Sequence, residues 1–418
     1  MGQLRETFRM LAEAPPRRTR SPPIDHSNHR FNRLERPLTH VTAFIPYYQR
    51  ESGLLREAIV SIFNQSILHE GSAGGYPCAV AQSWEATSGA PEGAPELGPC
   101  EVEILIVDDG SPITPASELE DLVVPDGCTI RIVERENGGV AKCRNTGLDS
   151  VRPDSDYFAM LDSDDVWSPW HLERALRALD GGADIYTSNW ITAETGEPAF
   201  ESLKKLRHGD HNPHGLLADA FEFVGDPLEQ EARSSIWRPS CLVFSWPKLG
   251  DLRNDPKQCY SSEDQLWRFQ MLARKPSSVF STRTEVRSGV GVSIFSGLRW
   301  TTDRGLLALS DRGRCMRKAR KIPGFSAGAR KLATQALALA RKDQVASVLH
   351  MTTRGQRPKL KTLFKMAVRD PLLAAIWPVY VAKAALARRA AKAPGEGPVE
   401  TAPEASNEGV PRAARWGE

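Results

Sequence analysis

Three carboxylates lie within four residues in the segment Asp162-Ser163-Asp164-Asp165, directly after the apolar run Tyr157–Leu161. The run has the length of a buried strand, so the acidic segment is expected where that strand reaches solvent. Like charges this close repel one another unless a cation lies among their oxygens. Hard divalent cations such as Mg²⁺ or Mn²⁺ take oxygen ligands and often share them with substrate phosphates. We therefore predict a metal site here, with a polar turn that caps the next helix as the alternative.

Short apolar runs alternate with helical patterns through the first half of the chain. Strands are predicted over residues 41–45 (ended by Pro46), 102–107, 129–133, 157–161 and 183–188. Helices are predicted over 54–65 and 140–151, and from Ser168-Pro169 through the apolar positions 172, 175, 176 and 179. This alternation indicates an α/β fold with a mainly parallel sheet and helices on both faces.

Polar segments follow four of these strands: Pro46–Arg50, Asp108–Ser111, Asn137–Gly139 and the aspartate segment. Ligands of such sheets bind beyond the carboxyl ends of the strands, so the four segments are expected to converge on one rim. Asn137–Gly139 opens a helix whose free N–H groups can face an anion.

These segments resemble the family 2 glycosyltransferases, which have the GT-A nucleotide-diphospho-sugar transferase fold. The resemblance is carried by Phe44–Arg50, Ile106–Ser111, Glu136–Gly147 and Phe158–Asp165. It is close over residues 41–189 and looser up to residue 296. It implies metal-dependent, inverting transfer from a nucleotide-diphospho-sugar, with a UDP-sugar favoured, to a hydroxyl of a glycan, glycolipid or other acceptor. Cell-envelope or exported glycan and glycolipid synthesis is the process it suggests.

Carried over residue by residue, the resemblance implies a donor nucleotide site made by Pro46, Tyr48, Arg50, Asp108, Asp109, Arg144 and Asp162. The first three would line the base and ribose. Asp108 or Asp109 would accept from the base imino group, and Arg144 would approach the diphosphate or sugar. An ordinary turn at 108–111 and a solvent-facing Arg144 remain the alternatives.

The Asp162-x-Asp164 pair matches the family's Asp-x-Asp motif, which places Mg²⁺ or Mn²⁺ on the donor diphosphate. Asp164 is predicted as the direct ligand, Asp162 as the sugar or ribose contact, and Asp165 as a second-choice ligand. The late Arg-x-His of the family is replaced by Arg287-Ser288-Gly289, so no third protein ligand is identified. The histidines at 208, 211 and 214 are not favoured as a metal site.

An acceptor-side base is the remaining requirement, and Ser261–Arg268 matches the family's Glu-Asp pair at a helix start. Asp264 is predicted to take the acceptor's proton, with Glu263 beside it. Plain helix capping by Ser262 is the alternative. In the acceptor-side strand predicted over Ile236–Phe244, Trp237 either stacks on a sugar or lies in the core.

The net charge of +2 hides a strong asymmetry, since residues 299–392 hold 22 Lys/Arg and 4 Asp/Glu. We predict a disordered basic arm (1–37), a GT-A domain (38–296) with a flexible insertion (70–100), a basic helical region (297–392) and a disordered tail (393–418). Contact of residues 355–392 with an anionic membrane and a helical cap packed on the catalytic domain are equally open.

Seven scattered cysteines without a C-x-x-C pair favour a reducing cytosol. No run reaches the ~18 apolar residues of a spanning helix, so a cytoplasmic enzyme is expected, with peripheral contact to the inner membrane face left open. Nucleic acid is not an expected partner. The rival functions are a sugar nucleotidyltransferase and a non-catalytic membrane- or polyanion-binding protein.

Overall fold

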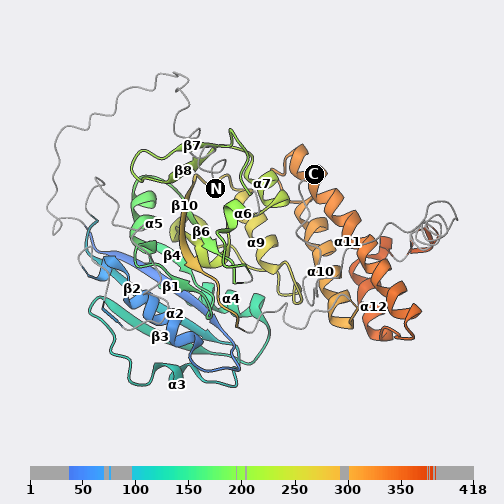
Figure 1. Cartoon of the computed structure of the whole chain (residues 1–418), viewed down its shortest axis with the longest axis horizontal. Coiled ribbons are helices and arrows are strands. Elements are labelled where there is room, and N and C mark those ends of the chain that lie inside the picture. The colour runs from blue at the N-terminus through green and yellow to red at the C-terminus, as the bar shows by residue number, and fades with distance from the viewer. Residues whose placement is uncertain are drawn as a thin grey trace, which may run out of the picture.

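The computed structural model describes residues 37–69, 75–76, 97–193, 195–202, 205–291, 301–373, 375, 377–379 and 382. Residues 1–36 of the predicted N-terminal arm, most of the predicted insertion and the predicted tail lie outside these residues. Figure 1 shows a sheet wrapped by helices, with the C-terminal helices α10, α11 and α12 extending from one side.

One sheet organises residues 39–287, in the order β3-β2-β1-β4-β9-β6-β10-β8-β7, with β5 beside β10. The strands are β1 (Thr39–Tyr47), β2 (Cys100–Asp108), β3 (Cys128–Glu134), β4 (Tyr157–Met160), β5 (Val166–Trp167), β6 (Ile185–Ile191), β7 (His211–Pro213), β8 (Ala220–Phe223), β9 (Leu242–Ser245) and β10 (Ser278–Arg287). The first four are parallel to their neighbours in that group, as predicted. β6 and β10 are also parallel to each other, whereas β5, β7, β8 and β9 pair antiparallel, so the sheet as a whole is mixed.

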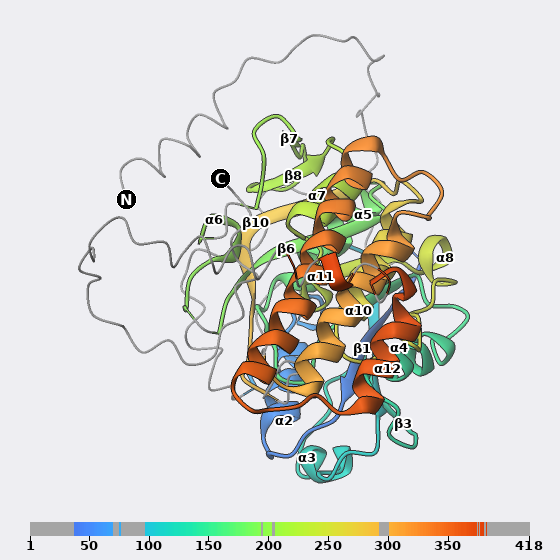
Figure 2. The same cartoon turned by 90° about the vertical axis from the view of Figure 1, so that its right-hand side faces the viewer.

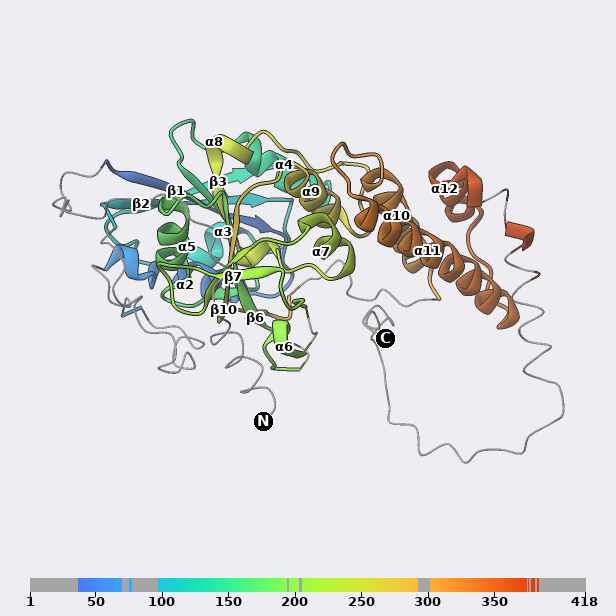
Figure 3. The ribbon, with the colours of Figure 1, turned by 90° about the horizontal axis from the view of Figure 1, so that it is seen from above.

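Helices cover both faces of the sheet, as Figure 3 shows from above. They are α2 (Leu54–Phe63), α3 (Pro115–Leu119), α4 (Val140–Asp149), α5 (His171–Asp180), α6 (Ala199–Ser202), α7 (Pro227–Arg233), α8 (Trp246–Leu249), α9 (Glu263–Leu272), α10 (Asp303–Ala319), α11 (Ala327–Thr353) and α12 (Leu360–Arg369). The mixed α/β sheet with its helices confirms the predicted fold class.

Three predicted boundaries are wrong for local reasons. β1 continues through Pro46 because β4 pairs with β1 only as far as Phe44, so the missing N–H deprives no partner strand. α5 begins at His171 rather than at Ser168-Pro169, because the Pro169 carbonyl oxygen accepts from the Ser66 N–H at 2.8 Å instead of from the first helical turn. The strand predicted over Ile236–Phe244 forms only from Leu242 onward, after a 3₁₀ turn.

The C-terminal helices α10 and α11 pack against the part of the chain that forms the sheet. Cys315 and Met316 of α10 and Ala333 and Leu337 of α11 belong to the same hydrophobic core as the sheet. Figure 2 shows α10, α11 and α12 side by side. α10 and α11 therefore form a helical cap packed against the sheet and its helices. No helix among the described residues is long and apolar enough to cross a membrane, and the six cysteines described there are all unpaired thiols.

A buried ion network joins α5, β6 and β10. The Glu285 carboxylate, 1% exposed, accepts from Arg174 Nε at 2.8 Å and Tyr186 Oη at 2.7 Å, and lies 3.0 Å from His171 Nδ1. Burial alone would raise the pKa of Glu285, but His171 and Arg174 outweigh it and lower the pKa. The network holds the second half of the sheet against α5.

Replacing Glu285 by leucine should lower the free energy of unfolding by about 3–5 kcal/mol, because Arg174 becomes an uncompensated buried charge. Urea denaturation at neutral pH measures it. Because the folded pKa lies below the ordinary value of 4.5, the wild-type contribution is complete above that pH and is lost as the pH falls through the folded pKa.

The matched control is Asp251→Leu. The Asp251 side chain is 70% exposed and pairs with Arg274 at the surface. The control variant should cost less than about 1 kcal/mol. Equal costs for the two variants would contradict the assigned role of Glu285.

Candidate active site

Gln49, just after β1, ties three of the four predicted polar segments together. Its N–H donates to Ser111 Oγ (2.8 Å), which donates back to the Gln49 carbonyl oxygen (2.9 Å). Its side-chain Nε2 donates to Ser163 Oγ (2.9 Å). The fourth segment joins through Asn137 Nδ2, which donates to the Asp109 carbonyl oxygen at 2.8 Å. The predicted convergence on one rim is therefore confirmed.

The N-terminus of α4 does face an anion, but the anion is the chain's own Asp109. The Gly138 N–H donates to Asp109 Oδ1 (3.0 Å) and the Gly139 N–H to Oδ2 (2.8 Å), while Arg135 forms an ion pair with the same carboxylate. Gly110 permits this approach, since it has φ +70° and a Cβ there would lie 3.1 Å from the Asn137 nitrogen. These N–H groups are therefore already paired within the chain.

The Asp108 carboxylate has fewer polar partners within the chain than the Asp109 carboxylate. Its Oδ1 accepts from the Ser111 N–H at 2.7 Å, and burial raises its pKa. Pro46 and Tyr48 are half-buried and flank Tyr47, the register partner of Asp108 in β1. Exposed Arg50 lies over the Tyr48 ring at 5.9 Å from the ring centre. The residues predicted for the base and ribose are thus on the rim, and their roles stay predictions.

The three aspartates after β4 have different surroundings. Asp162 and Asp164 are half-buried and Asp165 is 1% exposed. Asp164 Oδ2 accepts from the Gly291 N–H at 2.7 Å, whereas Asp165 accepts from the Gly289 N–H at 3.0 Å and pairs with Arg238 at 3.1 Å. Burial raises the pKa of Asp164, and the charge of Asp162 adds to it. Burial also raises the pKa of Asp165, to about 7, despite Arg238.

Arg144 connects this segment to α9. It is 5% exposed, and its Nη1 donates to Glu263 Oε1 at 2.9 Å while its Nη2 lies 3.3 Å from Asp162 Oδ1. The solvent-facing alternative for Arg144 is therefore wrong. Three segments that are far apart in sequence meet at one guanidinium, which brings the predicted base helix to the predicted metal ligands.

The two acids that begin α9 differ in exposure and in charge. Glu263 is buried, whereas the Asp264 side chain is 31% exposed and accepts from Arg268 Nη1 at 2.7 Å. Burial, with the charge of Asp264, raises the pKa of Glu263. Burial would raise the pKa of Asp264 as well, but Arg268 and Arg144 outweigh it and lower it. Ser262 has φ +59° and makes no side-chain cap, so the capping alternative is contradicted.

The alternative predicted for Trp237 is resolved by burial. Trp237 is 0% exposed and its Nε1 donates to Ser278 Oγ at 2.9 Å, so it belongs to the core. His211 packs against the rings of Phe221 and Phe280. A cavity of about 140 Å³ lies at the opposite, amino end of β1–β3 and takes no part in this rim.

Sequence reasoning missed the positioning roles of Gln49, Arg238 and Gly291. Gly289 and Gly291 come directly after β10 and pack against the aspartates, with a Cβ on Gly289 lying 1.7 Å from the Asp164 carbonyl oxygen. A Gly-x-Gly spacing at a strand end, where backbone must pass closely, is the pattern that would have found this loop.

Residues 42–221 match the family model described as glycosyl transferase family 2. The chain is 35% identical over 262 residues to the succinoglycan biosynthesis protein ExoW of Rhizobium meliloti (strain 1021), which covers 62% of this chain and 71% of that protein. This chain belongs to glycosyltransferase family 2. The glycosyltransferase is also 27% identical over 148 residues to the putative glycosyltransferase EpsH of Bacillus subtilis (strain 168), which covers 35% of this chain and 38% of that protein.

Solved structures similar to this glycosyltransferase include S. aureus TarS in complex with UDP-GlcNAc, with 14% identity, a TM-score of 0.44, and coverage of 74% of this chain and 73% of that one. Another is the mannosyltransferase PcManGT of Pyrobaculum calidifontis in complex with GDP-Man and Mn²⁺, with 16% identity, a TM-score of 0.42, and coverage of 84% and 88%. Family membership and the mixed sheet together give the glycosyltransferase a GT-A fold with added C-terminal helices.

Gly289→Ala should destabilise the glycosyltransferase by about 1–3 kcal/mol, because the new Cβ overlaps the Asp164 carbonyl oxygen and forces the 288–291 loop away from the aspartates. Chemical denaturation measures the change. Gly215→Ala is the control, since nothing lies within 4 Å of its added Cβ and its φ is not positive. Unchanged stability of Gly289→Ala would mean that the loop does not pack as described.

Proposed function

We propose that this glycosyltransferase moves a sugar from a nucleotide-diphospho-sugar to an acceptor hydroxyl with inversion, assisted by Mg²⁺ or Mn²⁺ at Asp164 and Asp162. One observation carries the proposal. Five ion pairs compensate carboxylates of the rim: Asp109–Arg135, Asp162–Arg144, Glu263–Arg144, Asp165–Arg238 and Asp264–Arg268. Asp164 forms no ion pair in the part of the chain that the structure describes. Asp108 forms none there either, but it lies in the 108–111 turn, so Asp164 of the Asp162-x-Asp164 segment is the carboxylate that we assign to a cation.

The residues at this position suit a hard cation. Asp164 and Asp162 are half-buried carboxylates. Burial and the charge of Asp162 raise the pKa of Asp164, which means that its charged form is disfavoured; a bound cation would favour that form. No cluster of three or more His, Cys, Asp or Glu among the described residues forms a complete metal cage. Such partial protein ligation is typical of Mg²⁺, which keeps waters and takes phosphate oxygens. When bound, the cation would offset the charge of the leaving nucleoside diphosphate.

Asp165, predicted as the second-choice ligand, is assigned a different role in this proposal. Its two oxygens accept from Gly289 and Arg238, so it holds the glycine loop over the rim. For the base of the donor, Asp108 is preferred to Asp109, because both oxygens of Asp109 already accept backbone N–H groups. Tyr48 and Arg50 line the ribose side.

Asp264 is the proposed base for the acceptor hydroxyl. The Asp264 side chain reaches solvent, whereas Glu263 is buried and forms an ion pair with Arg144. Arg268 orients the Asp264 carboxylate and keeps it ionised, so it can accept a proton as the glycosidic bond forms. Glu263 acts indirectly, by fixing the arginine that joins α9 to Asp162.

Exported or cell-envelope glycan synthesis is the proposed process, supported by the succinoglycan biosynthesis role in the name of ExoW. A UDP-sugar is the proposed donor. The sugar nucleotidyltransferase alternative is disfavoured by the segment after β1, Pro46-Tyr47-Tyr48, which is not a glycine-rich, basic phosphate loop.

The first test is a screen of nucleotide sugars with and without Mn²⁺. The wild type should turn over at least one donor in a metal-dependent manner. Asp164→Asn should lower kcat/KM by at least about tenfold and weaken Mn²⁺ binding in calorimetry, because it removes a ligand. Asp154→Asn, at an exposed carboxylate paired with Arg152, should change neither. Metal binding that survives Asp164→Asn would place the cation elsewhere.

The second test separates the two acids of α9. Asp264→Asn should lower kcat by about 10²–10⁴-fold with donor binding retained, because only the proton acceptor is lost. Since the pKa of Asp264 lies below its ordinary value of 3.8, no acid limb of the wild-type rate should arise from it above that pH. An acid limb near pH 7 that disappears in Glu263→Gln would instead identify Glu263 as the base.

A further inference from the structure

Helix α12 presents an apolar stripe to solvent. Leu360, Phe364 and Val368 recur every four residues on one face and are 84%, 70% and 62% exposed, and Leu372 just beyond the helix is 54% exposed. Of the eleven large hydrophobic residues exposed in the described part, five lie between residues 360 and 379. The stripe is therefore a concentrated feature rather than a scatter of single apolar residues.

The opposite face of α12 is anchored to the cap. Thr362 and Met366 are buried, and Met366 packs in a cluster with Leu306, Val348 and Met351. The stripe consequently points away from the protein. α12 runs along the outer edge of the C-terminal helices in Figure 2.

Positive charge surrounds the stripe. Residues 354–369 contain six Lys/Arg and no Asp/Glu. Four of these, Arg354, Arg357, Lys359 and Lys361, are exposed. An amphipathic helix with Phe and Leu on one face and lysines beside them has the character of a helix that lies in the interface of a bilayer.

We propose that α12 docks this glycosyltransferase on an anionic phospholipid bilayer. Leu360, Phe364 and Val368 enter the boundary between headgroups and acyl chains, and Lys359 and Lys361 contact lipid phosphates. A second copy of the chain is a poor occupant of this face, because an isologous contact would bring two sets of like charges together. The glutamate-rich residues 393–418 are the competing occupant within the chain.

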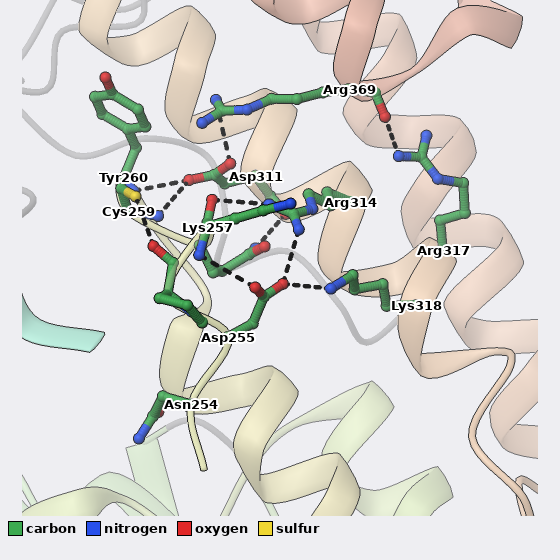
Figure 4. Close-up of polar contacts among 12 residues, drawn as sticks. Asn254, Asp255, Lys257, Cys259, Tyr260, Asp311, Arg314, Arg317, Lys318 and Arg369 are labelled. Carbon is green, nitrogen blue, oxygen red and sulfur yellow. Dashed lines mark hydrogen bonds and ion pairs between the residues drawn. The ribbon is translucent and has the colours of Figure 1, made fainter. Parts of the chain in front are cut away.

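The anchored side of α12 also contacts the loop that leads into the catalytic helix (Figure 4). Arg369 lies 3.2 Å from Asp311 Oδ1 and over the Tyr260 ring at 5.2 Å from its centre. Asp311 Oδ2 accepts from the N–H groups of Cys259 (2.9 Å) and Tyr260 (2.7 Å). Docking of α12 thus sets the orientation of the segment that ends at Glu263 and Asp264 relative to the bilayer.

The test is co-sedimentation of the full-length protein with phosphatidylcholine vesicles, with and without phosphatidylglycerol. The wild type should bind the vesicles that contain phosphatidylglycerol. Leu360→Ser/Phe364→Ser should lower the partition coefficient by about tenfold or more, since both apolar anchors are lost. Lys359→Gln/Lys361→Gln should weaken vesicle binding, and added salt should weaken wild-type binding, because both reduce the attraction between the lysines and the anionic lipid. Phe364→Leu, which keeps an apolar side chain, should retain binding.

Val123→Ser is the matched control, because Val123 is 74% exposed and lies in the loop after α3, away from the stripe. It should bind vesicles like the wild type, and all variants should keep the wild-type melting temperature, since the changed side chains are solvent-exposed. Equal binding by wild type and stripe variant would overturn the proposal. So would a dimer, seen by sedimentation velocity without vesicles, that the stripe variant abolishes. Vesicle binding that appears only after removal of residues 393–418 would likewise overturn it and assign the face to the tail.

Discussion

Charge compensation at the rim is the constraint on which the site depends. Several carboxylates are gathered at one edge of a sheet, and buried charges of one sign are unstable together unless each finds a partner. Arg144 is the central partner, because it is buried and contacts both Glu263 of α9 and Asp162 after β4. It joins two halves of the site that are built from distant parts of the chain. The glycine loop after β10 completes the arrangement by donating backbone N–H groups to Asp164 and Asp165.

Much of the first half of the fold could be predicted from the sequence, because β1, β2 and β4 contain short, mostly apolar runs that end at polar segments. The second half could not. β7, β8 and β9 have only three or four residues each, too few for a periodic pattern, and their antiparallel pairing depends on tertiary contacts. Likewise, Pro46 looks like a strand end in the sequence, yet only the early end of the pairing between β1 and β4 explains why the strand tolerates it.

In the site, the residue types could be predicted from the sequence, but the role of each residue could not. Sequence motifs identified the acids at 108, 109, 162, 164 and 165, but chemically identical side chains can have opposite surroundings. Asp109 and Asp165 accept hydrogen bonds from glycine N–H groups and pair with arginines, whereas Asp164 forms no ion pair among the described residues. Those differences arise from backbone approaches at Gly110, Gly138 and Gly289, which depend on how loops from different strands meet. Composition indicated a basic helical region, but not that α10 and α11 complete the core of the catalytic part.

The anchoring of the 254–262 loop has a consequence for how this enzyme can be dissected. The segment that matches the family model stops at residue 221, before α9, and the loop into α9 rests on Asp311 of α10 and, through Arg369, on α12. Asp255 of the same loop pairs with Arg314 of α10. A fragment cut at the limit of the family match would lack the proposed base, and one cut after α9 would leave that base on an unsupported loop. The loop that leads to the proposed base therefore depends on contacts with α10 and α12, which makes these helices part of the folded enzyme rather than an appendage.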